Sequence, residues 1–117
     1  MTLEELRRQT EVRFIDYDET IRILRKAAAE AKAAHPEIVK VLLFGSFVQG
    51  TWTADSDADL FVVVRKELSD FFSRSPYMIF APGISVDSIV YSDAEFARLS
   101  RDPESFLAQN LPTALEM

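Results

Sequence analysis

The sequence predicts one α/β or α+β domain in which strands are separated by helices. Apolar residues recur at helical spacing over 18–34, whereas residues 39–44 and 60–64 form β-branched, apolar runs typical of buried strands. A chain of 117 residues is long enough for one hydrophobic core and too short for a second of similar size. We therefore expect a single domain over 1–117, with a core at about 20–92 and a helical C-terminal extension over 93–117.

The N-terminal half is expected to contain two helices followed by a strand. A Thr and a Glu three residues apart at the start of the chain have the form of a capping box and predict a short helix over 3–9. The helical periodicity predicts a longer helix over 18–34, with Pro36 just beyond its end. Residues 39–44 then predict a strand that ends at Gly45.

The C-terminal half is expected to alternate between strands and short helices. After one helical turn at 46–49, we expect a central strand at 60–64, a short helix at 67–74, a strand at 77–80, a Pro-Gly turn at 81–84, a strand at 85–91, and helices at 92–99 and 102–110. The helix at 67–74 should bury Leu68 with Phe71 or Phe72.

The composition excludes several classes of protein. A formal net charge of −6 argues against an extended nucleic-acid surface, because such a surface needs many cations. The chain has no Cys, so it has neither disulfides nor thiolate chemistry. It also has no apolar N-terminal segment and no apolar run of the length that spans a membrane, which together lead us to expect a cytoplasmic protein.

Asp55, Asp57 and Asp59 occupy every second position immediately before the strand at 60–64. Carboxylates with this spacing on a strand point to one side and repel one another unless something compensates them. A calcium loop would explain them, but it needs Gly where Leu60 stands and a bidentate Glu where Lys66 stands. We therefore reject an EF-hand.

A P-loop is also excluded. Gly45 and Gly50 have the spacing of its two glycines, but Thr51 and Trp52 replace the Lys and the Ser or Thr that should follow. A different phosphate site fits better, in which a tight turn at Gly45 and Ser46 aims backbone N–H groups and a hydroxyl at phosphate oxygens. Paired carboxylates on the next strand would then supply the hard oxygen ligands that Mg²⁺ prefers.

These residues resemble a known family. Gly45-Ser46, ten further residues and then Asp57-Ala58-Asp59 is similar to the signature of the DNA polymerase β-like nucleotidyltransferase superfamily. The short chain looks like its minimal nucleotidyltransferase (MNT) branch. The resemblance covers about residues 20–92 and includes Gly50 and a later strand aspartate, Asp87.

The resemblance implies a mixed β-sheet flanked by helices and a transfer of NMP, in the first instance AMP from ATP, to a hydroxyl group. It implies that Asp57, Asp59 and Asp87 are catalytic and bind metal, with two Mg²⁺ ions expected. It further implies that Gly45, Ser46 and Gly50 bind the nucleotide. Asp55 is expected to be an ordinary turn residue.

One departure from the family concerns the phosphate turn. Many members carry an Arg between the Gly-Ser pair and the next Gly, where this chain has Phe47-Val48-Gln49. One positive charge that would face phosphate is therefore missing, and Phe47 and Val48 are expected to pack the turn against the sheet.

Three functions stay open at this stage. Family members of this size commonly occur with a helical HEPN partner, and some are antitoxins that transfer AMP to a tyrosine of that toxin. The resemblance implies the same role for this chain. A second reading is a non-catalytic module that neutralises a partner by contact. A third is transfer to an aminoglycoside-like small molecule, for which an acidic surface would suit a cationic acceptor. An oligomer is compatible with all three.

Overall fold

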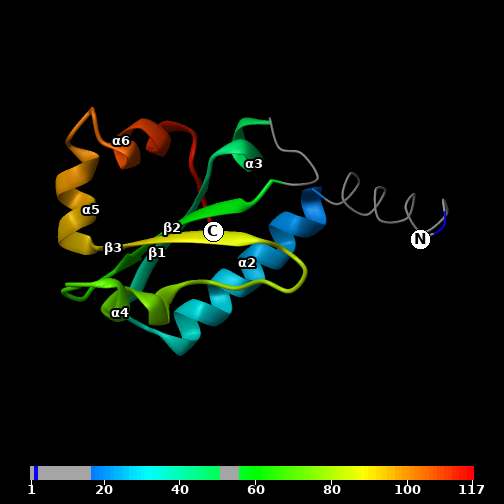
Figure 1. Cartoon of the computed structure of the whole chain (residues 1–117), viewed down its shortest axis with the longest axis horizontal. Coiled ribbons are helices and arrows are strands. Elements are labelled where there is room, and N and C mark those ends of the chain that lie inside the picture. Colours follow the sequence, from blue (N-terminus) through cyan, green and yellow to red (C-terminus); the bar gives the residue numbers. More distant parts are fainter. Residues whose placement is uncertain (1, 3–16, 51–55) are drawn as a thin grey trace.

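The computed structural model describes Thr2, residues 17–50 and residues 56–117. The elements, in chain order, are α2 (Tyr17–Ala34), β1 (Ile38–Phe44), α3 (Ser46–Gln49), β2 (Ala58–Val64), α4 (Phe71–Arg74), the 3₁₀ helix η1 (Ser75–Tyr77), β3 (Val86–Ser92), α5 (Asp93–Ser100), α6 (Phe106–Asn110), the 3₁₀ helix η2 (Leu111–Thr113) and β4 (Leu115–Glu116) (Figure 1). Strands alternate with helices, which confirms the predicted fold class. The helix predicted over 3–9 lies outside the described residues.

The four strands form one mixed sheet in the order β3-β2-β1-β4. β2 and β3 run parallel, whereas β1 is antiparallel to both β2 and β4. Every residue of β2 except Asp59 is buried, as expected of a central strand covered on both faces. The edge strand β4 was not predicted, because two residues are too few to show a periodic pattern.

Each face of the sheet is covered by different helices, with α2 on one side and α5 and α6 on the other (Figure 1). The first face joins alternate strand residues to α2, and its buried members include Leu24, Ala28, Val41, Leu43, Leu60 and Val62. The second face joins the intervening strand residues to α5 and α6, and its members include Leu42, Phe44, Phe61 and Leu107. Among the described helices, none is both long and apolar enough to cross a membrane.

The connection from β2 to β3 contains the largest departures from the predicted elements. The expected helix over 67–74 is a single turn, α4, because Asp70 and Ser73 form a capping box that starts the helix at Phe71. Leu68 is buried as predicted, but Phe71 and Phe72 are 66% and 80% exposed and do not pack with it.

The strand predicted over 77–80 is not a strand. Pro76 lies in the first turn of η1, which occupies the start of the segment. Further on, the backbone N–H of Ile79 donates at 3.1 Å to the side-chain hydroxyl of Ser88 in β3, not to a backbone carbonyl as in a strand pair. The turn that follows is as predicted, since Gly83 has a φ of 74° and the Ile84 N–H donates to the Ala81 carbonyl at 3.3 Å.

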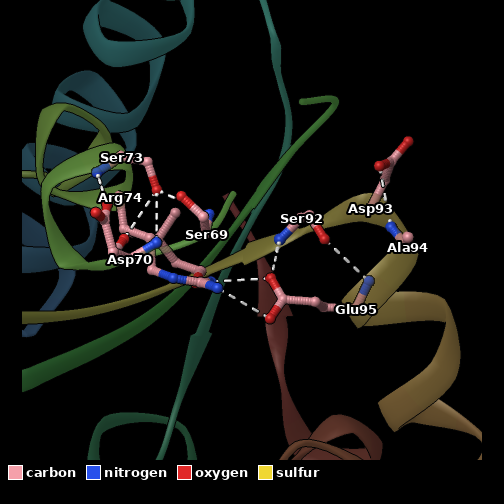
Figure 2. Close-up of polar contacts among 9 residues, drawn as sticks. Ser69, Asp70, Ser73, Arg74, Ser92, Asp93, Ala94 and Glu95 are labelled. Atoms are coloured by element: carbon pink, nitrogen blue, oxygen red, sulfur yellow. Dashed lines mark hydrogen bonds and ion pairs between the residues drawn. The ribbon is translucent and has the colours of Figure 1, made fainter. Parts of the chain in front are cut away.

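The last helix begins later than predicted. Asp102 was expected to cap a helix over 102–110, but its carboxylate accepts from the Glu104 N–H at 3.0 Å within a turn. The helix instead begins at Phe106, where the Ser105 hydroxyl accepts from the Ala108 N–H at 3.0 Å. By contrast, the capping box at the start of α5 was predicted correctly, with Ser92 and Glu95 bonded to each other's backbone (Figure 2).

Candidate active site

The end of β1 and the starts of β2 and β3 lie side by side at one end of the sheet and bring the predicted aspartates together. Asp59, near the start of β2, is the pairing partner of Phe44 at the end of β1 and of Asp87 near the start of β3. Directly paired residues point to the same face of a sheet, so Asp59 and Asp87 lie side by side on the face covered by α6. Asp57 precedes Asp59 by two residues and is exposed.

The electrostatics of Asp59 show that the three carboxylates interact. Asp59 is half-buried, and its pKa is raised by partial burial and then by the negative charges of Asp87 and Asp57. A carboxylate in this position takes up a proton, or attracts a cation, more readily than one in water. The fold therefore concentrates negative charge where a cation would relieve it.

The backbone of Gly45 lies directly beside the Asp59 side chain. It has a φ of 81° and a ψ of −148°, a backbone conformation that is essentially restricted to glycine. A Cβ added at this position would lie 2.7 Å from the Oδ2 atom of Asp59. The turn and the carboxylate therefore touch, and the glycine of the Gly-Ser pair is required by the carboxylate that follows it in the motif.

The turn after Gly45 is a single helical turn, α3, and its ends are well anchored. The Gly45 carbonyl accepts from the N–H groups of Val48 and Gln49 at 3.2 and 3.1 Å. Gly50 closes the turn in the left-handed conformation, with its N–H donating to the Ser46 carbonyl. Ser46 lies at the start of this turn and is half-buried.

The residues that follow the Gly-Ser pair pack the turn against the sheet. Phe47 is buried in the core on the α2 side, and Val48 packs against the same core, as the sequence predicted. In addition, the Tyr17 hydroxyl donates to the Phe47 carbonyl at 2.9 Å, and the two rings stack with centroids 6.3 Å apart. Tyr17 was missed from the sequence because its partner is 30 residues away and no local pattern links the two.

The donor set fits a magnesium ion by its chemistry, since it consists of carboxylate oxygens that already influence one another. Within the described residues, no three Asp, Glu, His or Cys side chains are arranged as a ready-made metal cage. Mg²⁺ does not require one, because it usually binds through one or two carboxylates together with waters and substrate phosphates. Asp55 lies outside the described residues.

Comparison with known proteins agrees with this geometry. The pattern of the nucleotidyltransferase domain family matches residues 21–108, so the chain belongs to that family. It is therefore an enzyme of the nucleotidyltransferase class, whose members generally use a nucleoside triphosphate and a divalent metal ion.

A solved structure supports the same fold. The crystal structure of a "putative nucleotidyltransferase from Sulfolobus solfataricus" matches with a TM-score of 0.57 and 24% sequence identity, over 74% of this chain and 78% of that one. The search of curated proteins finds no match to this chain. The predicted mixed sheet flanked by helices is thus confirmed, and at this level of identity the structural match speaks for the fold alone.

Proposed function

We propose that the protein is a Mg²⁺-dependent nucleotidyltransferase that transfers NMP, most simply AMP from ATP, to a hydroxyl group of an acceptor. The observation that carries the proposal is the position of Asp59. It touches the Gly45 turn, and its pKa is raised first by partial burial and then by the charges of Asp87 and Asp57. A turn that can bind phosphate and a group of mutually repelling carboxylates that can bind metal lie at the same end of the sheet. A metal–triphosphate site requires both.

Each residue then has a defined role. Asp57 and Asp59 would hold Mg²⁺, and Asp87 would contribute a further ligand and accept the proton of the attacking hydroxyl. The Gly45 backbone and the Ser46 side chain would bind the β and γ phosphates, and Gly50 would fix the end of the turn that presents them. When bound, Mg²⁺ would neutralise charge on the triphosphate and on the departing pyrophosphate.

The reaction balances without a further reactant. The acceptor oxygen forms a bond to the α-phosphorus, and the bond from that phosphorus to the bridging oxygen of the β-phosphate breaks. Pyrophosphate leaves, and the hydroxyl proton passes to a carboxylate of the site.

The absence of Cys agrees with a reducing, cytoplasmic setting.

The acceptor is proposed from the resemblance alone to be a tyrosine of a HEPN-type partner, so that the enzyme would act as an antitoxin. The formal charge of −6 would also suit a cationic small molecule of the aminoglycoside type. These acceptors differ in size and charge, and a transfer assay separates them directly.

The first experiment incubates the full chain with Mg²⁺ and radiolabelled ATP in the presence of the product of the neighbouring gene or an aminoglycoside. The wild type is compared with Asp57→Asn/Asp59→Asn and with Glu30→Gln/Glu67→Gln, which removes two exposed carboxylates outside the site. We expect label on an acceptor with the wild type and the control, and at least a hundredfold less with the aspartate variant.

A different result would overturn the proposal. If none of the four nucleotides labels any acceptor, and both the wild type and Asp57→Asn/Asp59→Asn neutralise the partner equally well, the protein is a contact inhibitor. Label on the aminoglycoside alone would retain the chemistry and replace the acceptor.

A further inference from the structure

Phe106, the first residue of α6, presents an aromatic ring next to the candidate active site. The residue is 54% exposed although its ring also packs against other rings. It meets Phe44 edge-on at a centroid distance of 5.6 Å and Phe61 at 6.0 Å. Phe44 and Phe61 are themselves stacked face to face, 3.8 Å apart and 6° from parallel. We call these three residues the aromatic shelf.

The shelf is continuous with the carboxylates. Phe44 directly precedes Gly45 and is the pairing partner of Asp59, which places their Cβ atoms about 5 Å apart. Phe61 follows Asp59 by two residues on the same strand and therefore points to the same face. Because Phe106 covers both rings, its exposed part lies on the same face of the sheet as Asp59 and Asp87.

Phe71 and Phe72, which are also exposed, do not share this setting. Phe71 and Phe72 lie on α4, and Arg74 of that helix is bonded to the Val90 carbonyl and to Glu95. These partners lie at the end of β3 that is remote from Asp87. Phe80 is exposed as well, but it is not one of the three rings of the aromatic shelf. Phe106 is distinguished by its contact with two buried rings that adjoin Asp59.

A nucleoside triphosphate combines a charged chain with a flat apolar base. In the proposed function, the Gly45 turn and the aspartates take the triphosphate and the α-phosphorus, so the base must lie on a neighbouring surface. The exposed ring of Phe106 is such a surface, and its packing against the buried rings of Phe44 and Phe61 holds it in place. Every base has a flat face that can stack on an aromatic ring.

We propose that Phe106 is a nucleotide-binding residue that stacks on the base of the nucleoside triphosphate. The inference rests on the proposed function and adds the site of base recognition. Stacking involves no hydrogen-bond readout, so the site should accept all four bases and favour the larger purines.

The test measures the affinity of the full chain, in the presence of Mg²⁺, for a non-hydrolysable ATP analogue and for inorganic tripolyphosphate by calorimetry. The main variant is Phe106→Leu, which keeps apolar packing on Phe44 and Phe61 but removes the aromatic face. Phe106→Tyr keeps that face, and Phe72→Ala removes an exposed ring outside the site. Thermal unfolding of each variant shows whether the fold is retained.

We expect Phe106→Leu to weaken binding of the ATP analogue by about 5- to 100-fold and to change binding of tripolyphosphate by less than about twofold. Phe106→Tyr and Phe72→Ala should leave both affinities within about twofold of the wild type.

Three outcomes would overturn the inference. Equal weakening of both ligands would show that Phe106 only supports the shape of the site. Unchanged binding of the ATP analogue would show that the base lies elsewhere, and a raised KM for the acceptor in that case would assign the ring to the acceptor instead. A wild type that binds neither ligand would reject the proposed function itself.

Discussion

Asp87 near the start of β3 and Glu95 in α5, just beyond its end, lie in opposite electrostatic surroundings. Glu95 accepts from both terminal nitrogens of Arg74 at 2.9 and 3.0 Å and from the Ser92 N–H at 2.9 Å (Figure 2). The ion pair with Arg74 is the main cause of a lowered pKa for Glu95. Near the start of β3, Asp87 lies beside Asp59, whose pKa is raised by burial and by neighbouring carboxylates.

Glu95 is a carboxylate that stabilises the folded state, whereas the ionised form of Asp59 destabilises it. The bonds of Glu95 join α4 to the start of α5 and are complete within the chain. The charge of Asp59 is made less favourable by folding and is suited to a ligand that brings positive charge. The two sites should therefore respond in opposite directions to the loss of a negative charge, which the following predictions test.

The largest effect is expected for Gly45→Ala. Its new Cβ would collide with the Asp59 carboxylate, and the residue would be strained at a φ of 81°. We expect about 3 kcal/mol or more to be lost from the free energy of unfolding, and at least a hundredfold to be lost from the transfer rate. Urea unfolding and the transfer assay measure the two quantities.

Gly83→Ala is the matched control for Gly45→Ala. Gly83 has a φ of 74°, but nothing lies within 4 Å of an added Cβ. It should therefore lose only the strain of about 1–2 kcal/mol and retain activity. Equal losses in the two variants would show that the contact between the turn and Asp59 has no consequence.

The second largest effect is expected for the ion pair between Glu95 and Arg74, just beyond the end of β3. Glu95→Gln should retain an acceptor for the Ser92 N–H but lose the ion pair, at a cost of about 1–2 kcal/mol in the free energy of unfolding. The exposed pair of Glu19 with Arg22 serves as the control, and Glu19→Gln should cost clearly less than Glu95→Gln because water screens the exposed charges.

The pH dependence of this effect has a defined sign. The pKa of Glu95 in the folded protein lies below its ordinary value of 4.5, so its stabilising contribution is complete above pH 4.5 and is lost as the pH falls further. The stability difference between the wild type and Glu95→Gln should shrink over that range. A difference that is constant from pH 7 down to pH 3 would contradict the assignment.

A smaller effect is expected for Tyr17→Phe, which removes the hydroxyl that anchors α3. The lost hydrogen bond to the Phe47 carbonyl should cost about 1 kcal/mol and should raise the KM for the nucleotide about 3- to 10-fold with a smaller change in kcat. Ser92→Ala removes a helix cap of similar value elsewhere and should leave KM unchanged. A KM that rises equally in both variants would indicate general destabilisation.

The smallest effect is a gain in stability from Asp59→Asn. Since the pKa of Asp59 is raised in the folded protein, its ionised form opposes folding at neutral pH. Its removal should add about 0.5 kcal/mol or less to the free energy of unfolding, because solvent screens this partly exposed group. The gain should disappear as the pH falls below the ordinary pKa of 3.8, where the carboxylate is protonated in both states. A loss of stability at pH 7 would show that Asp59 has a stabilising partner.

Magnesium offers a complementary measurement on the same pair of proteins. An ion that binds only the folded wild type raises its unfolding temperature, by an amount equivalent to about 2.7 kcal/mol at a concentration one hundred times its dissociation constant. Asp59→Asn should show little of this shift. An equal shift in both proteins would place the ion elsewhere.

Local patterns in the sequence were sufficient for much of the fold and for the candidate site. The long helix, the strands around Gly45 and Asp59 and the capping box of Ser92 and Glu95 were predicted because periodicity and capping act between residues a few positions apart. The order of Gly45, Ser46, Asp57, Asp59 and Asp87 was likewise readable along the chain, and the structure brings Asp59 and Asp87 into register.

Only the tertiary structure decided the features that depend on distant partners. The segment at 77–80 has strand-like residues but bonds to the Ser88 side chain, and β4 exists because it meets the open edge of β1. The bond from Tyr17 to Phe47 and the placement of Phe106 over Phe44 and Phe61 join positions far apart in the chain. Such contacts form when the sheet and its helices pack, so no local pattern can report them.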